Sequence, residues 1–433
     1  MNAAAPGAPA PRCVATVPRG LGDLLVGELK ALGIADARER GANVLFGGGL
    51  ESAYRACLHS RVASRVLLEI AHFSAPTAED YYQAARAIDW GTHCTPGATL
   101  ACEFTGRHPA ITHSQFGALR LKDAICDRLR ADTGSRPDVD PARPSVRIHA
   151  HANAAQLTLY VDLAGEGLHR RGYRTEAGEA PLRENVAAGL LLRAGWPALA
   201  RRGAAFLDPL CGSGTLVIEA AMYAMRIPPQ LYREDFAFMR WADFDPLLWA
   251  DVRTNARAEM RTIHFPILGY DKNFQAVQAS EANAKAAHLE GKVRFDRRRF
   301  ETLTPVAEKG ILMMNPPYDA RITDNHIEGL YEMIGDQLKK AFTGYEAWII
   351  SANQEALKHL GLRPSKKIPL FNGALECRFI KLELYEGTRK FLQDRPRSTE
   401  QKETGPIPKT RQRKFPPGED TRGLRKRKDR DKP

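Results

Sequence analysis

Apolar and polar positions along the first 180 residues follow two different spacings. Apolar residues recur at helical intervals in two stretches, 21–32 and 116–130. Short apolar or alternating runs, typical of strands, occur at 13–17, 43–46, 66–73, 99–104 and 157–163. The last of these runs leads into a turn that contains Gly165 and Gly167. This mixture predicts an α+β fold for the N-terminal part of the chain.

After about Pro181 the two patterns alternate in regular order. We expect helices at 183–193, 215–225 and 273–287, and strands at 205–208, 267–271, 311–314 and 347–351. Regular alternation predicts a doubly wound parallel sheet with helices on both faces. Ligands of such sheets bind at the carboxyl ends of the strands. Functional residues are therefore expected directly after these strands.

Length and composition are those of an ordinary soluble protein with two or three domains. The chain has 433 residues, of which 43% are hydrophobic and 26% charged. No stretch approaches the roughly 20 apolar residues that cross a bilayer, so we expect no membrane span. Residues 1–11 lack the apolar run of a secretory signal, and we expect a disordered leader there.

The seven cysteines are scattered and never occur in a C-x-x-C spacing. Their odd number and their spacing predict a reducing cytoplasm and argue against disulfides and structural zinc. His108 and His113 stand in the same loop without a cluster of further ligands, so we expect no metal site.

Positive charge is concentrated at the C-terminal end. Residues 389–433 contain 16 Lys and Arg but 7 Asp and Glu, so they supply nine of the net charge of +12. The segment 387–433 has few apolar residues, which predicts a disordered basic tail. Such a tail attracts phosphates in a salt-sensitive way, which favours a nucleic acid as partner. A tail that only aids solubility is the alternative.

The first candidate site lies where a strand gives way to a helix, in Asp208-Pro-Leu-Cys-Gly-Ser-Gly-Thr215. Gly212 and Gly214 let the backbone approach a ligand closely, and the start of the helix offers free N–H donors. A nucleoside or an amino-acid group would fit there. The Gly-Lys-Ser/Thr ending of a phosphate loop is absent. For the glycines alone, a structural turn without a ligand is an equal alternative.

Asp271 ends the next predicted strand, about 60 residues further along. A carboxylate at this position of a doubly wound sheet can accept hydrogen bonds from both ribose hydroxyls of an adenine nucleoside. The alternative is structural, with Asp271 as the cap of the helix that begins near Asn273.

The third candidate is Asn315-Pro316-Pro317-Tyr318, which follows the strand predicted at 311–314. Two prolines remove two N–H donors, so the groups here, including the amide oxygen of Asn315, accept hydrogen bonds. An amino group is the matching substrate, and Tyr318 offers a flat surface for an extruded base. Accepting both amine hydrogens would turn the nitrogen lone pair toward an incoming methyl group. A proline-stiffened loop with a packed tyrosine is the structural alternative.

In order and spacing, the glycine segment, Asp271 and Asn315-Pro-Pro-Tyr318 resemble the cofactor loop, ribose acid and amino-methylating motif of class I methyltransferases. Two further segments resemble the link between a THUMP domain and the catalytic domain in bacterial 23S rRNA guanine-N2 methyltransferases. These segments are Leu168-His-Arg-Arg-Gly-Tyr-Arg174 and Ala180-Pro-Leu-Arg-Glu-Asn-Val-Ala-Ala-Gly-Leu190. The resemblance covers about residues 12–386, and its motifs are specific as a set.

The resemblance implies an α/β fold, with a Rossmann-like class I methyltransferase domain at 167–386. It places an α+β ferredoxin-like domain at 12–70 and a THUMP RNA-binding domain at 71–166 before it. The implied cofactor is S-adenosyl-L-methionine, with its ribose on Asp271 and its methionine part on Asp208, Leu210, Cys211, Gly212, Ser213, Gly214 and Thr215. Within the catalytic motif, which includes Pro317, Asn315 and Pro316 would hold a guanine amino group, and Tyr318 would stack on the base. Arg183 and Glu184 would close over the cofactor or form a plain surface ion pair.

One departure concerns the contact to the cofactor's adenine. Where the family usually has an Asp, this chain reads Arg297-Arg-Arg-Phe300-Glu301. The adenine would then be contacted by Phe300 with Glu301. The alternatives are Asp296 or backbone groups. The arginine triplet itself is expected to be solvated or to face RNA. Larger relatives carry a second methyltransferase half, which is not found here, and this implies a single methylation.

These implications give one hypothesis, the N2-methylation of a guanine flipped out of 23S ribosomal RNA or a ribosomal precursor. The alternatives are a guanine in transfer RNA, adenine-N6 or cytosine-N4 methylation of DNA, and a non-catalytic RNA-binding factor in ribosome assembly. Trp241 and Trp249 are expected to fill the core rather than to form a lid.

Overall fold

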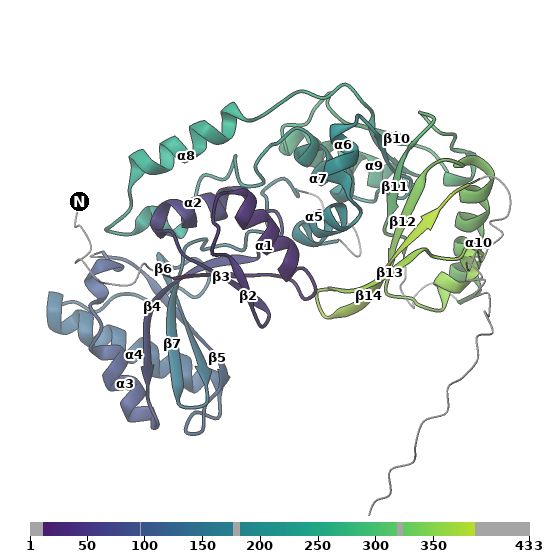
Figure 1. Cartoon of the computed structure of the whole chain (residues 1–433). Coiled ribbons are helices and arrows are strands. Elements are labelled where there is room, and N and C mark those ends of the chain that lie inside the picture. Colours follow the sequence, from purple (N-terminus) through teal and green to yellow (C-terminus); the bar gives the residue numbers. More distant parts are fainter. Residues whose placement is uncertain (1–11, 96, 176–181, 318–323, 386–433) are drawn as a thin grey trace, which may run out of the picture. The chain divides into compact units, whose positions relative to one another are not determined.

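The computed structural model of the chain describes residues 12–95, 97–175, 182–317 and 324–385. The chain divides into two compact units, Met1–Glu386 and Gly387–Pro433. The predicted leader and basic tail lie outside the described residues. Within the described ranges, the first unit contains two seven-stranded sheets, and Figure 1 labels most of their strands.

The first sheet has the strand order β2-β3-β1-β4-β7-β6-β5. Its strands are β1 (Cys13–Thr16), β2 (Arg38–Arg40), β3 (Asn43–Phe46), β4 (Arg65–Ser74), β5 (Leu100–Arg107), β6 (Val146–Asn153) and β7 (Gln156–Asp162). β4 joins the two halves of the sheet, because it pairs with β1 at one edge and with β7 at the other. The predicted boundary between the ferredoxin-like and THUMP domains, after residue 70, therefore falls inside one continuous strand.

Helices cover this sheet and close its core. They are α1 (Gly22–Ala31), α2 (Gly49–His59), α3 (Ala78–Arg86), η1 (Trp90–Thr92) and α4 (Ser114–Thr133). α3 and α4 pack against each other, and α4 also packs on β5 (Figure 1). The start of α3 is fixed by a capping box, in which Thr77 and Asp80 each accept a hydrogen bond from the other's backbone N–H. The apolar faces of these elements form one buried cluster with the inner side chains of the sheet.

The second sheet has the order β10-β9-β8-β11-β12-β14-β13. Its strands are β8 (Ala205–Asp208), β9 (Ile267–Asp271), β10 (Arg294–Arg297), β11 (Gly310–Met314), β12 (Glu346–Ser351), β13 (Lys366–Asn372) and β14 (Leu375–Glu383). The strands from β10 to β12 in this order are parallel. β14 and β13 form an antiparallel hairpin at one edge.

Alternate side chains of the central strands enter opposite helical layers. Phe206 and Met313 join a cluster with residues of α5 (Glu184–Arg193), α7 (Thr215–Ala224) and α9 (Phe274–Ala286). Leu207 and Leu312 join a second cluster with residues of α10 (Asp324–Ala341). Because neighbouring residues of a strand face opposite sides, this division places helices on both faces of the sheet. Three shorter helices, α6 (Trp196–Arg201), η3 (Phe300–Thr302) and η4 (Ala356–Leu360), complete the layers.

One segment of the predicted methyltransferase region completes the core of the first sheet. It contains η2 (Ala237–Arg240) and α8 (Pro246–Ala258). Trp241 and Trp249 are each only 4% exposed and belong to the apolar cluster of the N-terminal part. The indole of Trp249 meets the ring of Tyr54 from α2 edge to face, with centroids 5.8 Å apart. Both tryptophans therefore fill the core, as the sequence analysis expected.

The predicted fold class and elements are confirmed, with helix and strand ends within three residues of the predicted ones. The antiparallel hairpin of β13 and β14 at one edge of the second sheet was not among the predicted elements. Its signal is Asn372-Gly373 between two apolar runs, because Gly373 adopts the positive φ of 65° that a tight hairpin turn requires.

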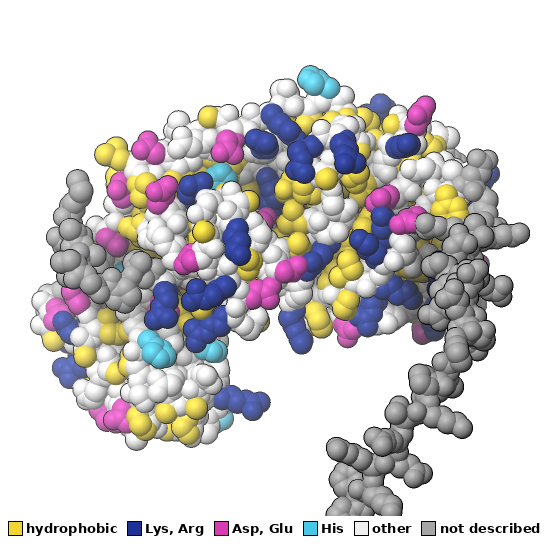
Figure 2. All heavy atoms as spheres, viewed as in Figure 1, with side chains coloured by type: hydrophobic (Ala, Val, Ile, Leu, Met, Phe, Trp, Pro, Cys, Tyr) yellow, Lys and Arg dark blue, Asp and Glu magenta, His cyan; other side chains and the backbone are white. Residues whose placement is uncertain are grey.

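None of the described helices is long and apolar enough to span a membrane. On the face drawn in Figure 2, Lys and Arg side chains gather where Figure 1 labels α6 and α9. Basic surface is therefore present on the folded part of the chain as well as in the segment 389–433.

Replacing Trp249 by Ala should destabilise the protein by about 3–5 kcal/mol, because the change leaves a large cavity between α8 and α2. Leu247→Ala on the same helix is the control, since Leu247 is 78% exposed. Urea unfolding followed by circular dichroism measures both. A similar midpoint for the two variants would contradict the packing described for Trp249.

Candidate active site

The three candidate segments meet at the carboxyl edge of the second sheet. β8 lies between β9 and β11, and all three strands run parallel. Leu207 is level with Leu268 on one side and with Leu312 on the other. The glycine loop, Asp271 and Asn315 therefore leave three neighbouring strands at the same edge. This is the position at which doubly wound sheets bind their ligands.

The two glycines of the loop serve different purposes. Gly212 has a φ of 53°, and nothing lies within 4 Å of the place that a Cβ atom would occupy. Gly214 has a φ of 81°, and a Cβ there would lie 3.0 Å from the ring of Phe295. Both positions favour glycine because of their backbone conformation. Gly214 also allows tight packing below the loop, whereas Gly212 leaves open space for a ligand.

Hydrogen bonds from the neighbouring strand and helix hold the loop in this conformation. The N–H of Cys211 donates to the carbonyl of Tyr270 at 2.9 Å. From α9, the Ser280 hydroxyl donates to the carbonyl of Gly212 at 2.7 Å, and the Asn283 amide donates to that of Ser213 at 3.0 Å. The loop is thus fixed before any ligand arrives. Ser280 and Asn283 were not predicted, although their signal is present: they are polar residues on the buried side of a helix.

Asp271 helps to form the loop. Its Oδ2 accepts a hydrogen bond from the N–H of Gly212 at 3.1 Å, and its Oδ1 accepts one from the N–H of Asn273 at 2.9 Å. The residue that caps α9 is Asn273, whose side chain accepts from the N–H of Gln275. The alternative that Asp271 is the helix cap is therefore wrong.

Asp208 is a buried carboxyl group next to a second one. Its side chain is almost fully buried and accepts one hydrogen bond, from the N–H of Leu210 at 3.1 Å. Burial, and to a lesser extent the charge of Asp271, raises the pKa of Asp208 well above its ordinary value. A cationic ligand at this edge would lower that pKa again and stabilise the carboxylate.

The amide oxygen of Asn315 is buried and has no hydrogen-bond partner among the described residues. A buried acceptor without a donor costs free energy, so such a group is typical of a site that awaits a ligand. The two residues that follow are Pro316 and Pro317, neither of which has an N–H to donate. The arrangement can accept hydrogen bonds from an amino group. Tyr318 lies outside the described residues.

Comparison with known families finds matches in three stretches of the chain. Residues 12–67 match the RlmL ferredoxin-like domain, residues 75–162 the THUMP domain, and residues 171–381 the RMKL-like methyltransferase domain. The chain thus contains an RlmL ferredoxin-like domain, a THUMP domain and an RMKL-like methyltransferase domain.

A curated relative of this methyltransferase is the ribosomal RNA large subunit methyltransferase K/L of Methylococcus capsulatus. It is 44% identical over 376 residues, which cover 86% of this chain and 51% of the relative. The chain thus spans about half the length of the curated relatives it matches.

Two solved structures are also similar to this methyltransferase. The crystal structure of SMU.472 complexed with SAH is 28% identical, with a TM-score of 0.78. The match covers 88% of this chain and 99% of the SMU.472 chain. A predicted N6-adenine-specific DNA methylase from Listeria monocytogenes is 25% identical with a TM-score of 0.77, over 87% and 97% of the two chains.

The remaining predicted loop residues lie at the same edge of the methyltransferase sheet. Thr215 begins α7, and Ser213 and Cys211 are buried while Leu210 is partly exposed. Burial raises the pKa of the Cys211 thiol well above its ordinary value, so Cys211 is not a reactive thiolate. Their contacts with a cofactor stay predictions.

The residues predicted near the adenine differ in exposure. Phe300 is 2% exposed and its ring stacks on Phe342, with centroids 5.8 Å apart, so its side chain packs in the core. Glu301 is exposed, and Asp296 forms an ion pair with Arg294 at 2.9 Å. Because Arg297 is level with Asp271 in the parallel pairing, this segment does end beside the predicted ribose acid.

Arg183 and Glu184 do not form the surface ion pair that was the alternative to a cofactor role. Glu184 is buried, and its Oε1 lies 3.4 Å from Nε of Arg174. Arg174 was not predicted as a site residue. It donates to the Thr215 hydroxyl at 2.9 Å and to the carbonyl of Leu182 at 2.7 Å, so it ties the start of α7 to the segment before α5.

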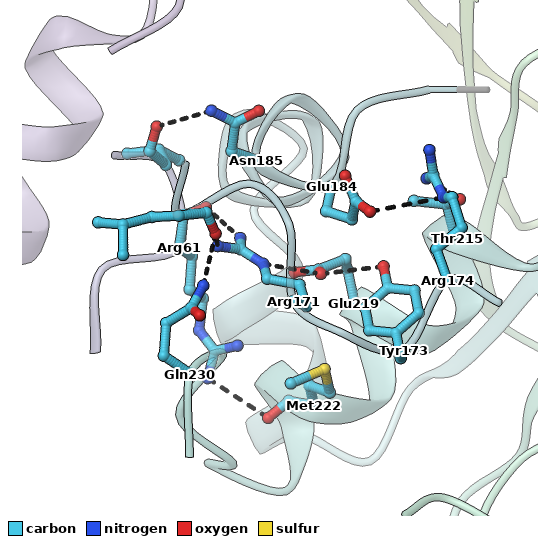
Figure 3. A network of polar contacts seen from close by, with 12 residues as sticks. Arg61, Arg171, Tyr173, Arg174, Glu184, Asn185, Thr215, Glu219, Met222 and Gln230 are labelled. Atoms are coloured by element: carbon cyan, nitrogen blue, oxygen red, sulfur yellow. Dashed lines mark hydrogen bonds and ion pairs between the residues drawn. The ribbon is translucent and has the colours of Figure 1, made fainter. Parts of the chain in front are cut away.

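A buried polar network lies behind the loop and reaches the N-terminal part of the chain (Figure 3). Glu219 of α7 accepts hydrogen bonds from Nε of Arg171 at 3.3 Å and from the hydroxyl of Tyr173 at 3.1 Å. Arg171 also donates to the carbonyl of Arg61, which precedes β4. The side chains of Arg171 and Glu219 are both 0% exposed. The helix that carries the loop is thus linked directly to the N-terminal part.

Of the two histidines considered in the sequence analysis, His108 has a structural role. His108 is buried between two backbone groups, the carbonyl of Ala75 at 2.7 Å and the N–H of Ala110 at 3.1 Å. The seven cysteines are all free thiols. No cluster of metal-binding side chains occurs among the described residues.

Replacing Asp208 by Asn should raise the melting temperature of the ligand-free protein. The pKa of Asp208 is higher in the folded protein than in the unfolded chain. At a pH below the ordinary aspartate pKa the group is neutral in both states and does not disfavour folding. As pH rises through the higher pKa of the folded state, the buried group must ionise, and stability is lost. The stabilising effect of Asn should therefore be present at neutral pH and shrink as pH falls toward the ordinary aspartate range.

Thermal melts at several pH values measure this effect. Asp336→Asn is the control, because Asp336 is exposed and pairs only with Lys339 among the described residues. A gain that is equal at all pH values, or equal in both variants, would speak against a strained carboxyl group at position 208.

Proposed function

We propose that the chain methylates N2 of a guanine in 23S ribosomal RNA, with S-adenosylmethionine as methyl donor. The observation that carries this proposal is the buried, unpartnered amide oxygen of Asn315, one strand away from the glycine loop. An acceptor in that place fits an amino group that must be held beside a bound cofactor. The curated relatives are named ribosomal RNA large subunit methyltransferases, which supports ribosomal RNA as the substrate.

The loop fits S-adenosylmethionine in its chemistry. That molecule supplies an electrophilic methyl group on a positively charged sulfur. Asp208 and Asp271 provide acidic groups at the edge of the sheet, and Gly212 leaves space for a ligand close to the backbone. In our proposal Asp271 accepts the ribose hydroxyls, and Asp208 and the loop amides hold the methionine part. The neighbouring structure that contains SAH has the same fold over 88% of this chain.

Asn315 has a defined task in the proposed reaction. The guanine amine is a poor nucleophile, because its lone pair is conjugated with the ring. In our proposal Oδ1 of Asn315 and the backbone carbonyl of Pro316 each accept one amine hydrogen, which points the lone pair at the methyl group. The N–C bond then forms as the S–C bond breaks, and the amine loses one proton to solvent. Placement and electrostatics supply the rate, without a nucleophilic side chain.

Three features favour RNA as the carrier of the base. The chain contains a THUMP domain, its relatives are named for ribosomal RNA, and its surplus of positive charge suits a polyanion. Ribosomal RNA also implies the cytoplasm as the place of action. The name of the Listeria neighbour favours a second candidate, adenine-N6 methylation of DNA, because the same acceptors suit that amine.

The deciding experiment is deletion of the gene, followed by mass spectrometry of nucleosides from ribosomal RNA, transfer RNA and DNA. We expect one N2-methylguanosine to disappear from 23S ribosomal RNA and to return when the gene is restored. Loss from transfer RNA, or loss of N6-methyladenine from DNA, would replace the proposed substrate. A complete set of modifications in the deletion strain would favour a non-catalytic assembly factor.

Asn315→Ala should lower turnover by about a hundredfold, because it removes an acceptor that acts on the reacting amine. The dissociation constant of S-adenosylmethionine, measured by calorimetry, should stay nearly the same. Asn315→Asp keeps an acceptor oxygen in the same place and should retain clearly more activity than Ala. Equal turnover in the Ala variant and the parent would refute this role.

A further inference from the structure

A basic pocket of about 600 Å³ lies next to the candidate active site. Five arginines and two glutamates belong to its wall. They are Arg170, Arg171, Arg174, Arg183 and Arg233, with Glu166 and Glu184. His169, Gly172 and Tyr232 complete the lining among the described residues. Figure 3 shows three members of this wall, Arg171, Arg174 and Glu184, together with Thr215 at the start of α7.

Three of the five arginines are already used in the fold. Arg171 binds Glu219 and two carbonyl oxygens, and Arg233 donates to the carbonyls of Ala164, Glu166 and Asp235. Arg174 donates to Thr215 and Leu182 and lies near Glu184. These guanidinium groups form a rigid charged wall, because their orientation is fixed by several partners each.

The other two arginines are available at the mouth of the pocket. Arg170 pairs with Glu166, but both side chains are more than half exposed, so the pair contributes little. Arg183 is exposed, and its guanidinium makes no hydrogen bond or ion pair with any described residue. Arg183 was predicted as a cofactor residue, yet it lines this pocket and caps the start of α5 with its backbone only.

Several arginine charges act on His169, which indicates a positive electrostatic potential inside the pocket. Burial and, to a lesser extent, the charges of Arg183, Arg171, Arg170 and Arg65 together lower the pKa of His169 to about 4. At neutral pH this imidazole is therefore uncharged and offers one N–H donor. An anion in the pocket would raise its pKa.

We propose that this pocket binds backbone phosphates of the RNA beside the nucleotide that is methylated. The proposal rests on the proposed function for the nature of the substrate. A flipped base leaves its flanking phosphates close to the mouth of the active site, and Arg174 connects the pocket to the first residue of α7. Arg170 and Arg183 supply the guanidinium groups that bind phosphate oxygens. Tyr232 in the lining is 41% exposed and packs against the ring of His288, with centroids 3.9 Å apart, and we assign the rest of its exposed surface to an adjacent base.

The test uses the full chain and compares Arg183→Ala with Arg257→Ala. Arg257 is an exposed arginine of α8 without a side-chain partner among the described residues, so both variants lose one surface charge. The probe is a short fluorescein-labelled RNA hairpin with a guanine in its loop. Its affinity is measured by anisotropy at several salt concentrations, and the affinity for S-adenosylmethionine by calorimetry.

We expect Arg183→Ala to weaken RNA binding roughly fivefold and to lower the salt dependence by about one released ion. Arg257→Ala should have a smaller effect on both quantities. Arg183→Lys should recover part of the affinity, because a lysine restores the charge without the planar fork. In NMR titrations the pKa of His169 should rise when the hairpin binds and stay low when S-adenosylmethionine alone binds.

Three outcomes would overturn the proposal. Equal RNA affinity in the two Ala variants, or no binding of the hairpin by the parent chain, would exclude a phosphate site here. Weaker binding of S-adenosylmethionine to Arg183→Ala with unchanged RNA affinity would assign Arg183 to the cofactor instead. If the parent transfers no methyl group to ribosomal RNA while the binding results hold, the proposed function fails and the phosphate site stands.

Discussion

The buried ion pair between Arg171 and Glu219 is the interaction on which the arrangement of the candidate active site depends. Both side chains are shut off from solvent, and loss of one partner would leave an uncompensated charge at a cost of about 3–5 kcal/mol. Glu219 stands one turn after the start of α7, the helix that follows the glycine loop. Arg171 reaches the backbone of the N-terminal part through Arg61. The pair therefore fixes the loop against both halves of the folded chain.

Near this helix, the carboxyl edge of the second sheet carries groups whose burial is unfavourable without a ligand. Asp208 is a carboxyl group with a raised pKa, Asn315 has an acceptor without a donor, and Gly212 borders open space. The first two lower the stability of the free protein, and all three suit the ligands of our proposal, a cation near the loop and an amine beside the prolines. Unfavourable groups of this kind can be retained because the packing of the surrounding core holds them in place.

Much of the fold could be predicted from the sequence because its signals are local. The glycine loop, Asp271 and Asn315 follow predicted strands, and parallel pairing brings strand ends together without knowledge of any distant contact. The partners of the loop were harder to find. Arg174, Ser280 and Asn283 reach it from other elements, and only their polar character on buried surfaces marks them. The β13–β14 hairpin had a clear local signal in Asn372-Gly373. It was missed because the regular alternation of helices and strands before it favoured a parallel sheet.

The place of α8 in the N-terminal core has a consequence for how the protein can be divided. Tyr54 on α2 relies for its neighbours on Phe238, Phe244 and Trp249, which come much later in the chain. Cutting the chain between the THUMP and catalytic regions would therefore expose an aromatic surface on both products. Evolution or engineering can exchange the catalytic region only if the segment with η2 and α8 stays with the N-terminal part or is replaced by one that packs equally well.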